Sequence, residues 1–190
     1  MNSDEIVTQQ MAVVCNVLTK HEVDFMIVGG FAVSVYGYRR PSTISLLKPE
    51  IKADFDFWYK PSLHNFQKLL NALKELKVDT TDLKKIVFDP QRTFLKIPHK
   101  GFHTDFLPSI SGVGTFSEVK KNSTLAEIDG STFPVIGYND LILSKLAINR
   151  KVDQEDIQAL EVINKKKDQT RTSQEEKLAT LKKKKRGRRI

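Results

Sequence analysis

With 190 residues, of which 39% are hydrophobic, the chain can bury one core and suits a single compact domain with a short appendage. We expect no membrane association, because no apolar run approaches the roughly 20 residues that span a bilayer and the N-terminal sequence lacks the order of a signal peptide. Cys15 is the single cysteine, which excludes an internal disulfide and favours a reducing, cytoplasmic location.

The net charge of +8 is concentrated near the C-terminus. Residues 165–190 hold 12 Lys or Arg and 3 Asp or Glu, a balance of +9, so the other 164 residues hold 19 basic and 20 acidic groups. We therefore divide the chain into a near-neutral domain, 1–164, and a basic tail, 165–190. The like-charge block Lys182–Arg189 predicts a disordered tail, with at most a short helix at Gln174–Leu181. Such a tail is either a solubilising extension or an arm that binds RNA or DNA phosphates.

The N-terminal part of the chain alternates helix and strand patterns. Glu5–Lys20 has the spacing of an amphipathic helix, and the short apolar strand Val23–Val28 runs through Gly29-Gly30 into a helix-like segment, Phe31–Tyr36. A glycine pair at such a turn lets the backbone approach a ligand and leaves amide N–H groups at the helix start, where phosphate binds. Tight turns also need glycine where no ligand binds, so the glycine pair alone does not establish a phosphate-binding site.

Two aspartates separated by one aromatic residue lie in the segment Ala53–Tyr59. Its alternating pattern predicts a strand on which Asp54 and Asp56 point to the same side and repel each other. A fold tolerates this repulsion where positive charge sits between the carboxylates, most simply a divalent metal ion held by oxygen ligands. The alternative is an edge strand with two surface acids.

The rest of the chain contains both strand and helix patterns. Asp105, in the strand expected at Phe102–Leu107, is a candidate third carboxylate. The order of strands and helices predicts an α/β (α+β) fold, a mixed β-sheet with flanking helices. The expected elements are a helix from Pro61-Ser62, strands at Lys85–Phe88, Arg92–Ile97 and Phe102–Leu107, a hairpin at Leu125–Ile136, and helices at Asn139–Asn149 and Gln154–Ile163.

Lys145 lies in the apolar stripe of the helix expected at Asn139–Asn149. Its ammonium group either extends past the apolar surface to water or points into a cleft. Asp153 and Asp156 are expected to cap the next helix or to pair with Arg150. His103, two residues before Asp105, is interpreted as a surface histidine.

Taken together, these motifs resemble the nucleotidyltransferase superfamily with the polymerase-β-like fold. The resemblance covers roughly residues 25–160 and is closest to the small, minimal members, which include AbiEii-like toxins and aminoglycoside- and lincosamide-modifying enzymes. It is carried by Gly29-Gly30-Phe31-Ala32, Tyr36–Arg40, Asp54-Phe55-Asp56, Asp105-Phe106-Leu107, Gly112–Phe116, Tyr138–Lys145, Arg150 and Asp153–Ile157.

The resemblance implies a Mg²⁺-dependent nucleotidyltransferase that moves a nucleoside monophosphate from a nucleoside triphosphate to an acceptor hydroxyl. It leaves open an RNA end, a protein or a small molecule as the acceptor, and it is compatible with the toxin of a toxin–antitoxin pair, with an antitoxin protein as partner. In such a site the catalytic, Mg²⁺-binding carboxylates would be Asp54, Asp56 and Asp105, and the nucleotide would be bound by Gly29, Gly30, Arg39, Arg40 and Lys145.

The chain departs from the family at one place. In relatives an arginine-threonine element leads almost directly into the paired acids, whereas here Ile44–Ile51 intervenes after Pro41-Ser42-Thr43. We interpret this segment as an inserted loop over the cleft. The altered spacing keeps a second hypothesis open, a non-catalytic nucleotide- or nucleic-acid-binding module on the same fold. Pyrophosphate release with Mg²⁺ would separate the two hypotheses.

Overall fold

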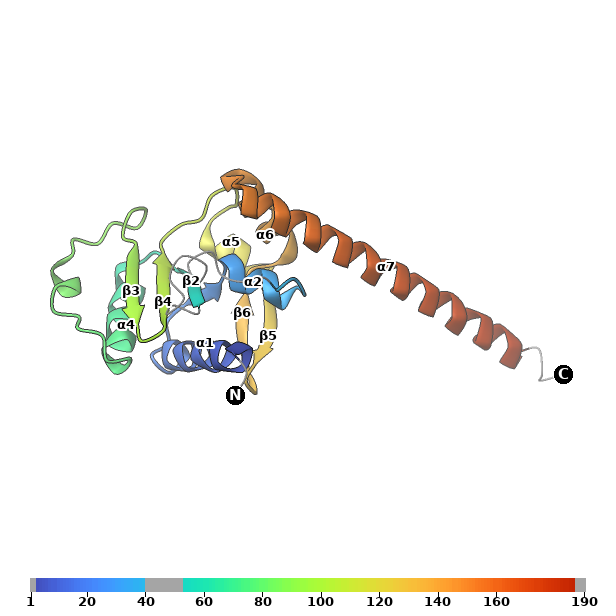
Figure 1. The fold of residues 1–190 in the computed structure, drawn as a ribbon, viewed down its shortest axis with the longest axis horizontal. Coiled ribbons are helices and arrows are strands. Elements are labelled where there is room, and N and C mark those ends of the chain that lie inside the picture. The colour runs from blue at the N-terminus through green and yellow to red at the C-terminus, as the bar shows by residue number, and fades with distance from the viewer. Residues whose placement is uncertain (1–2, 40–52, 187–190) are drawn as a thin grey trace.

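A six-stranded mixed sheet forms the centre of the computed structural model, which describes residues 3–39 and 53–186 (Figure 1). The strand order is β3-β4-β2-β1-β6-β5. The strands are β1 (Phe25–Ile27), β2 (Ala53–Tyr59), β3 (Leu95–His99), β4 (Phe102–Leu107), β5 (Thr124–Ile128) and β6 (Ser131–Val135). The helices are α1 (Ser3–Lys20), α2 (Gly29–Val35), α4 (Leu63–Glu75), the 3-10 helix η1 (Leu83–Lys85), α5 (Phe116–Lys121), α6 (Tyr138–Ile148) and α7 (Lys151–Arg186). The predicted mixed sheet with flanking helices is confirmed.

Strand β2 lies in the middle of the sheet, parallel to β4 and antiparallel to β1. In the β2–β4 pair, Asp54 is opposite His103 and Asp56 is opposite Asp105. Directly paired residues on neighbouring strands share a face of the sheet. The register therefore places the acids of both strands on the same face.

The opposite face of β2 is built into the core. Phe57 and Tyr59 are fully buried; Phe57 stacks on Phe106 of β4 with ring centroids 5.3 Å apart, and Tyr59 lies against Phe66 of α4. The Tyr59 hydroxyl donates a 2.6 Å hydrogen bond to the carbonyl of Thr93. Because α1 and α4 pack together, these rings are excluded from water. Burial of the aromatic side chains holds β2 in place and so positions Asp54 and Asp56 on its other face.

The structure differs from the prediction at two short elements, a predicted strand that is absent and a helix that was not predicted. The apolar run Lys85–Phe88 was expected as a strand, but the structure has η1 at its start and Val87 is 90% exposed. A strand needs a neighbour to pair with, and this run finds none in the described part of the chain. The helix α5 was not expected, although Thr115 and Glu118 form the capping box that begins it.

The largest difference from the sequence prediction is the length of α7, which has 36 residues and extends away from the sheet (Figure 1). The tail from Lys165 was expected to be disordered, and the structure is helical through Arg186. Residues 165–186 contain neither Gly nor Pro and are rich in Lys, Arg, Gln and Glu, which favour helix. Extending a formed helix also avoids the cost of nucleation, so repulsion in the Lys182–Arg186 block does not prevail.

None of the helices in the described residues is both long enough and apolar enough to cross a membrane.

Candidate active site

Three carboxylates lie on one face of the sheet, where β2 and β4 run side by side. Asp54 and Asp56 alternate along β2, and Asp105 is the cross-strand partner of Asp56. Burial, reinforced by the charges of Asp54 and Asp105, raises the pKa of Asp56 to about 7, although the backbone N–H of Gly30 and the charge of Lys145 oppose the shift. Burial likewise raises the pKa of Asp105 above its ordinary value. The structure thus brings the three predicted acids together, and their burial and mutual repulsion disfavour the charged form of Asp56 and Asp105.

Lys96, on β3, supplies positive charge beside these acids. Its ammonium group lies 3.0 and 3.1 Å from the two carboxylate oxygens of Asp105 and 3.8 Å from Oδ1 of Asp54. Burial acts to lower the pKa of Lys96, but the hydrogen bond and charge of Asp105 outweigh it, so the pKa lies above its ordinary value. A cation therefore already sits between acids of neighbouring strands.

The chemistry of these carboxylates, although not their arrangement, fits a divalent cation. Carboxylate oxygens are the ligands that Mg²⁺ prefers, and the Lys96 ammonium marks a position where positive charge is stabilised. Oδ1 of Asp54 is buried and has no hydrogen-bond partner among the described residues. In the same part of the chain, no three His, Cys, Asp or Glu side chains are arranged as a metal-ligand set. An ion bound here would compete with Lys96 for the carboxylates of Asp105 and Asp54.

The predicted glycine turn lies directly against Asp56. Gly29 begins α2 with φ +62°, a conformation that favours glycine, and the backbone N–H of Gly30 donates to the Asp56 carboxylate. Val28 donates its N–H to the Asp56 carbonyl at 3.0 Å, which fixes the turn on β2. One amide expected to face a phosphate is therefore engaged by a protein carboxylate.

Gly29→Ala tests this close approach. A Cβ at Gly29 would lie 1.9 Å from Oδ2 of Asp56, and the positive φ adds backbone strain. We expect the variant to lose at least about 1 kcal/mol of unfolding free energy in urea, since Ala at a positive φ costs more than the usual Gly-to-Ala gain. Gly130→Ala, also at positive φ but with nothing within 4 Å of its Cβ, is the matched control for strain alone. Equal losses in both variants would contradict a specific clash with Asp56.

Lys145 points into the protein and does not extend to water. Only 4% of the residue is exposed, and its ammonium lies 3.1 Å from Oδ1 of Asp153 and 2.7 Å from Oδ2 of Asp156. Both aspartates are fully buried on α7. Burial acts to raise the pKa of Asp153, but hydrogen bonds from Arg150 and Lys145 prevail and hold it below its ordinary value. The cluster joins α6 to α7 close enough to influence Asp56.

Of the two arginines expected to contact nucleotide, the structure describes the position of Arg39 only. Arg39 is exposed beyond the end of α2. Arg40 and the inserted segment Ile44–Ile51 lie outside the described residues. The roles of these residues, like those of the acids, glycines and Lys145, stay predictions.

Sequence reasoning did not find Lys96 as a partner of the acids. The short gap between the strands predicted at Arg92–Ile97 and Phe102–Leu107 contained the signal, because a tight hairpin there pairs Lys96 with Asp105, as observed. His103 was expected at the surface, but it is half-buried and its Nδ1 has no hydrogen-bond partner among the described residues. It faces the same side as the acids through its pairing with Asp54.

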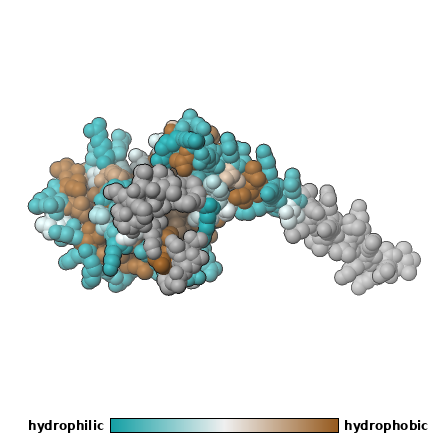
Figure 2. Space-filling view, viewed as in Figure 1, coloured by the Kyte–Doolittle hydropathy of each residue, from teal (hydrophilic) through white to brown (hydrophobic). Residues whose placement is uncertain are grey.

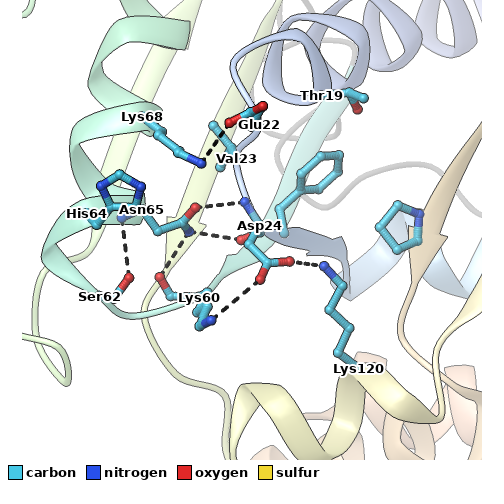
Figure 3. A pocket seen from close by; sticks show the side chains of 12 residues that line it. Thr19, Glu22, Val23, Asp24, Lys60, Ser62, His64, Asn65, Lys68 and Lys120 are labelled. Atoms are coloured by element: carbon cyan, nitrogen blue, oxygen red, sulfur yellow. Dashed lines mark hydrogen bonds and ion pairs between the residues drawn. The ribbon is translucent and has the colours of Figure 1, made fainter.

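A separate cavity of about 360 Å³ lies at the far end of β2 (Figure 3). Asn65 accepts a 2.7 Å hydrogen bond from the N–H of Asp24 and donates to the carbonyls of Asp24 and Lys60, both at 3.0 Å. The Asp24 carboxylate pairs with Lys120 and, at 3.9 Å, with Lys60. These contacts join the ends of β1 and β2 to α4 and α5, and none of the three acids lines the cavity.

Comparison with known proteins connects the acid-bearing face to a family. The family described as nucleotidyl transferase of unknown function (DUF2204) matches residues 7–186. The chain belongs to this family. It is thus a nucleotidyltransferase, as the resemblance in the sequence implied. A search of curated proteins gives no match.

Solved structures with a similar fold include two proteins linked to antibiotics. The lincosamide antibiotic adenylyltransferase LnuA, solved with lincomycin, superposes with a TM-score of 0.54 at 14% identity, covering 82% of this chain and 96% of that protein. The antibiotic-resistance factor ANT(2'')-Ia gives a TM-score of 0.51 at 11% identity, covering 96% and 98%. At such identities the likeness establishes the fold.

Proposed function

We propose that this nucleotidyltransferase is Mg²⁺-dependent and transfers a nucleoside monophosphate from a nucleoside triphosphate to an acceptor hydroxyl. The observation that carries the proposal is the pairing of Asp56 with Asp105 on parallel strands, with Asp54 on the same face and the Gly29-Gly30 turn against Asp56. Family membership supports nucleotidyl transfer itself. The metal is supported by the oxygen donors and by the buried Oδ1 of Asp54, which has no hydrogen-bond partner among the described residues and lies 3.8 Å from Lys96.

In this proposal Asp54, Asp56 and Asp105 hold Mg²⁺, which when bound supplies charge stabilisation at the phosphates and makes a hydroxyl more acidic. The acceptor oxygen forms a bond to the α-phosphorus, the bond to pyrophosphate breaks, and the hydroxyl proton passes to a base. We assign that base to Asp105, because its carboxylate lies beside the paired acids on the neighbouring strand, where it can accept a proton from a hydroxyl bound at this face.

The proposals for the acceptor and for the nucleobase of the donor nucleotide rest on different observations. An adenylyl donor and a small-molecule acceptor such as an antibiotic are proposed by analogy with LnuA, a lincosamide antibiotic adenylyltransferase of similar fold. An RNA or other nucleic-acid acceptor follows from the basic C-terminal segment. The role of a toxin with an antitoxin partner comes from the sequence resemblance, and the genomic neighbourhood of the coding sequence would test it.

One observation favours the non-catalytic alternative, a nucleotide-binding module on this fold. The Lys96 ammonium already neutralises Asp105 and approaches Asp54. If this ion pair is permanent, the acids have less capacity for a metal, and nucleotide binding without transfer is the expected outcome.

Incubation with α-³²P-labelled nucleoside triphosphates, Mg²⁺ and a cell extract tests the proposal. We expect label in an acceptor together with released pyrophosphate, and neither product with Asp54→Asn. Nuclease, protease and ultrafiltration then assign the acceptor to nucleic acid, protein or small molecule. Nucleotide that binds but stays intact with every acceptor fraction would support the binding module instead.

A further inference from the structure

Helix α2 connects the carboxylates to α7. At its start, Gly29 lies against the Asp56 carboxylate. Just beyond its end, a Cβ on Gly37 would lie 3.7 Å from Cγ2 of Ile163, and Lys167 donates from Nζ to the Tyr36 carbonyl at 3.5 Å. Because α2 has seven residues, about 10 Å of helix separates these two contacts. The stretch of α7 around Ile163 therefore passes close to the acids.

The beginning of α7 is fixed by buried charges. Asp153 and Asp156 both bind the Lys145 ammonium of α6, and Arg150 adds a 2.7 Å contact from Nε to Oδ2 of Asp153. With the contact near Ile163, α7 is attached to the domain at two places along its axis. The direction in which it leaves the domain is thus set by packing and is not that of a loose tail.

Beyond Lys167, α7 projects from the domain for 19 further residues, about 28 Å (Figure 1). Residues 165–186 contain ten Lys or Arg against three Asp or Glu, and the apolar residues among these 22 are Leu178, Ala179 and Leu181. Lys165, Lys166 and Lys167 are exposed. The described surface of α7 outside the domain is mostly hydrophilic (Figure 2).

This composition selects the kind of partner. A helix that docks on a protein needs an apolar stripe of at least three residues per two turns, and three apolar residues in six turns do not form one. Like charges at helical spacing destabilise each other, and a polyanion along the helix would relieve that repulsion. Phosphates repeated along a strand are matched by a segment that carries ten Lys or Arg in 22 residues of one helix.

We propose that α7 from Lys165 to Arg186 binds the phosphates of a polynucleotide whose end reaches Asp54, Asp56 and Asp105 as the acceptor. Binding to the helix stands independently, whereas the assignment as acceptor rests on the proposed function. The helix contributes affinity without sequence choice, because phosphate contacts position a strand and base contacts specify it. The two attachments of α7 to the domain keep the bound strand aligned with the acids.

Fluorescence anisotropy with labelled 20-nucleotide RNA and DNA tests the binding. In one variant Lys182, Lys183, Lys184 and Lys185 are replaced by Gln, which retains helix propensity. In the control, Lys74, Lys84, Lys85 and Lys100, which are exposed on the domain, are replaced by Gln with the same loss of charge. We expect the α7 variant to flatten the slope of log affinity against log salt by up to about 3, at about 0.7 per lost single-strand contact, and the control to leave it unchanged.

Two outcomes would overturn the binding. One is an equal loss in both variants, which would indicate general attraction to net charge. The other is competition by polyglutamate as strong as that by RNA, which would indicate an acidic protein as partner. A difference between the RNA and DNA arms identifies which polynucleotide is the better ligand.

A transfer assay tests the acceptor. With wild-type protein and labelled nucleoside triphosphate, we expect label at the oligonucleotide end, and the α7 variant should raise KM for the oligonucleotide at least about 10-fold relative to the control variant. If the wild type labels proteins or small molecules but never oligonucleotides, the acceptor assignment is overturned while the proposed function stands. If no acceptor is labelled and no pyrophosphate forms, the proposed function fails and the anisotropy result remains valid.

Discussion

Asp56→Asn is expected to reduce nucleotidyl transfer by about 10²- to 10⁴-fold while the protein stays folded. Charge stabilisation of the reacting phosphate by a carboxylate-bound metal ion is worth several kcal/mol of the barrier, and the neutral amide supplies one weaker ligand. The amide oxygen still accepts the hydrogen bond from the N–H of Gly30, so the turn on α2 is retained. Pyrophosphate release at saturating Mg²⁺ measures the effect, with Asp82→Asn, at an exposed carboxylate, as control.

The same variant has a signature in stability against pH. The folded pKa of Asp56, about 7, lies above its ordinary value of 3.8, so the folded state binds the proton more tightly than the unfolded state. Stability from this proton is complete below about pH 4 and is lost as the pH rises through 7. Asp56→Asn lacks this loss, so its unfolding free energy in urea with EDTA should exceed that of the wild type by about 1 to 3 kcal/mol at pH 8.

At pH 4 the two proteins should differ little. An Asp56→Asn variant that is less stable than the wild type at pH 8 would show that the carboxylate is paired by a positive group in the metal-free protein. Near wild-type turnover would remove Asp56 from the proposed metal site.

The paired acids and their strand were predictable because the evidence for them is local. Alternation along Ala53–Tyr59 determines which side chains share a face, and the structure confirms the strand. That Asp105 stands opposite Asp56 is a matter of register between residues 49 positions apart in the sequence, and no local pattern determines such a register. The strand pattern and the family resemblance indicated Asp105 as a candidate third carboxylate, and the structure supplied its pairing with Asp56.

Electrostatic partners were harder to predict than strands. Lys96 and Lys145 have the same charge, yet one approaches two carboxylates at the acid-bearing face and the other is buried between α6 and α7. The apolar stripe around Lys145 was compatible with both a surface and a cleft position. The deciding fact is the arrival of Asp153 and Asp156 from α7, a tertiary contact whose geometry depends on the turn at Asn149.

The helical conformation of residues 165–186 was not predicted because two opposing effects act on this part of α7. Repulsion within Lys182–Arg186 opposes helix, whereas intrinsic propensity and continuity with the packed start of α7 favour it. The charge pattern of the tail indicates only the repulsion. The continuity with a packed helix depends on the anchoring of α7 through Asp153 and Asp156, which the sequence of the tail does not contain.

Lys145→Met is expected to lower the unfolding free energy by about 3 to 5 kcal/mol, which corresponds to a fall in Tm on the order of 10 °C for a protein of this size. Methionine retains most of the aliphatic volume, so packing changes little. The loss arises because the carboxylates of Asp153 and Asp156, both fully buried, no longer have the ammonium that neutralises them. Thermal and urea unfolding at pH 7 measure it, with Lys85→Met as control, since its exposed ion pair with Asp82 contributes at most about 1 kcal/mol.

A double variant separates the lost charge pair from lost packing. Lys145→Met with Asp156→Leu replaces one buried ion pair by apolar groups, leaving Arg150 to pair with Asp153. Replacing both members of a buried pair is often neutral, whereas removing one is costly, so the double variant should be more stable than Lys145→Met. If Lys145→Met unfolds within about 1 kcal/mol of the wild type, water reaches the two aspartates and α7 is not fixed by charge. In that case the arm would lose one of its two attachments, and alignment of a bound strand with the acids would depend on the contacts near Ile163 alone.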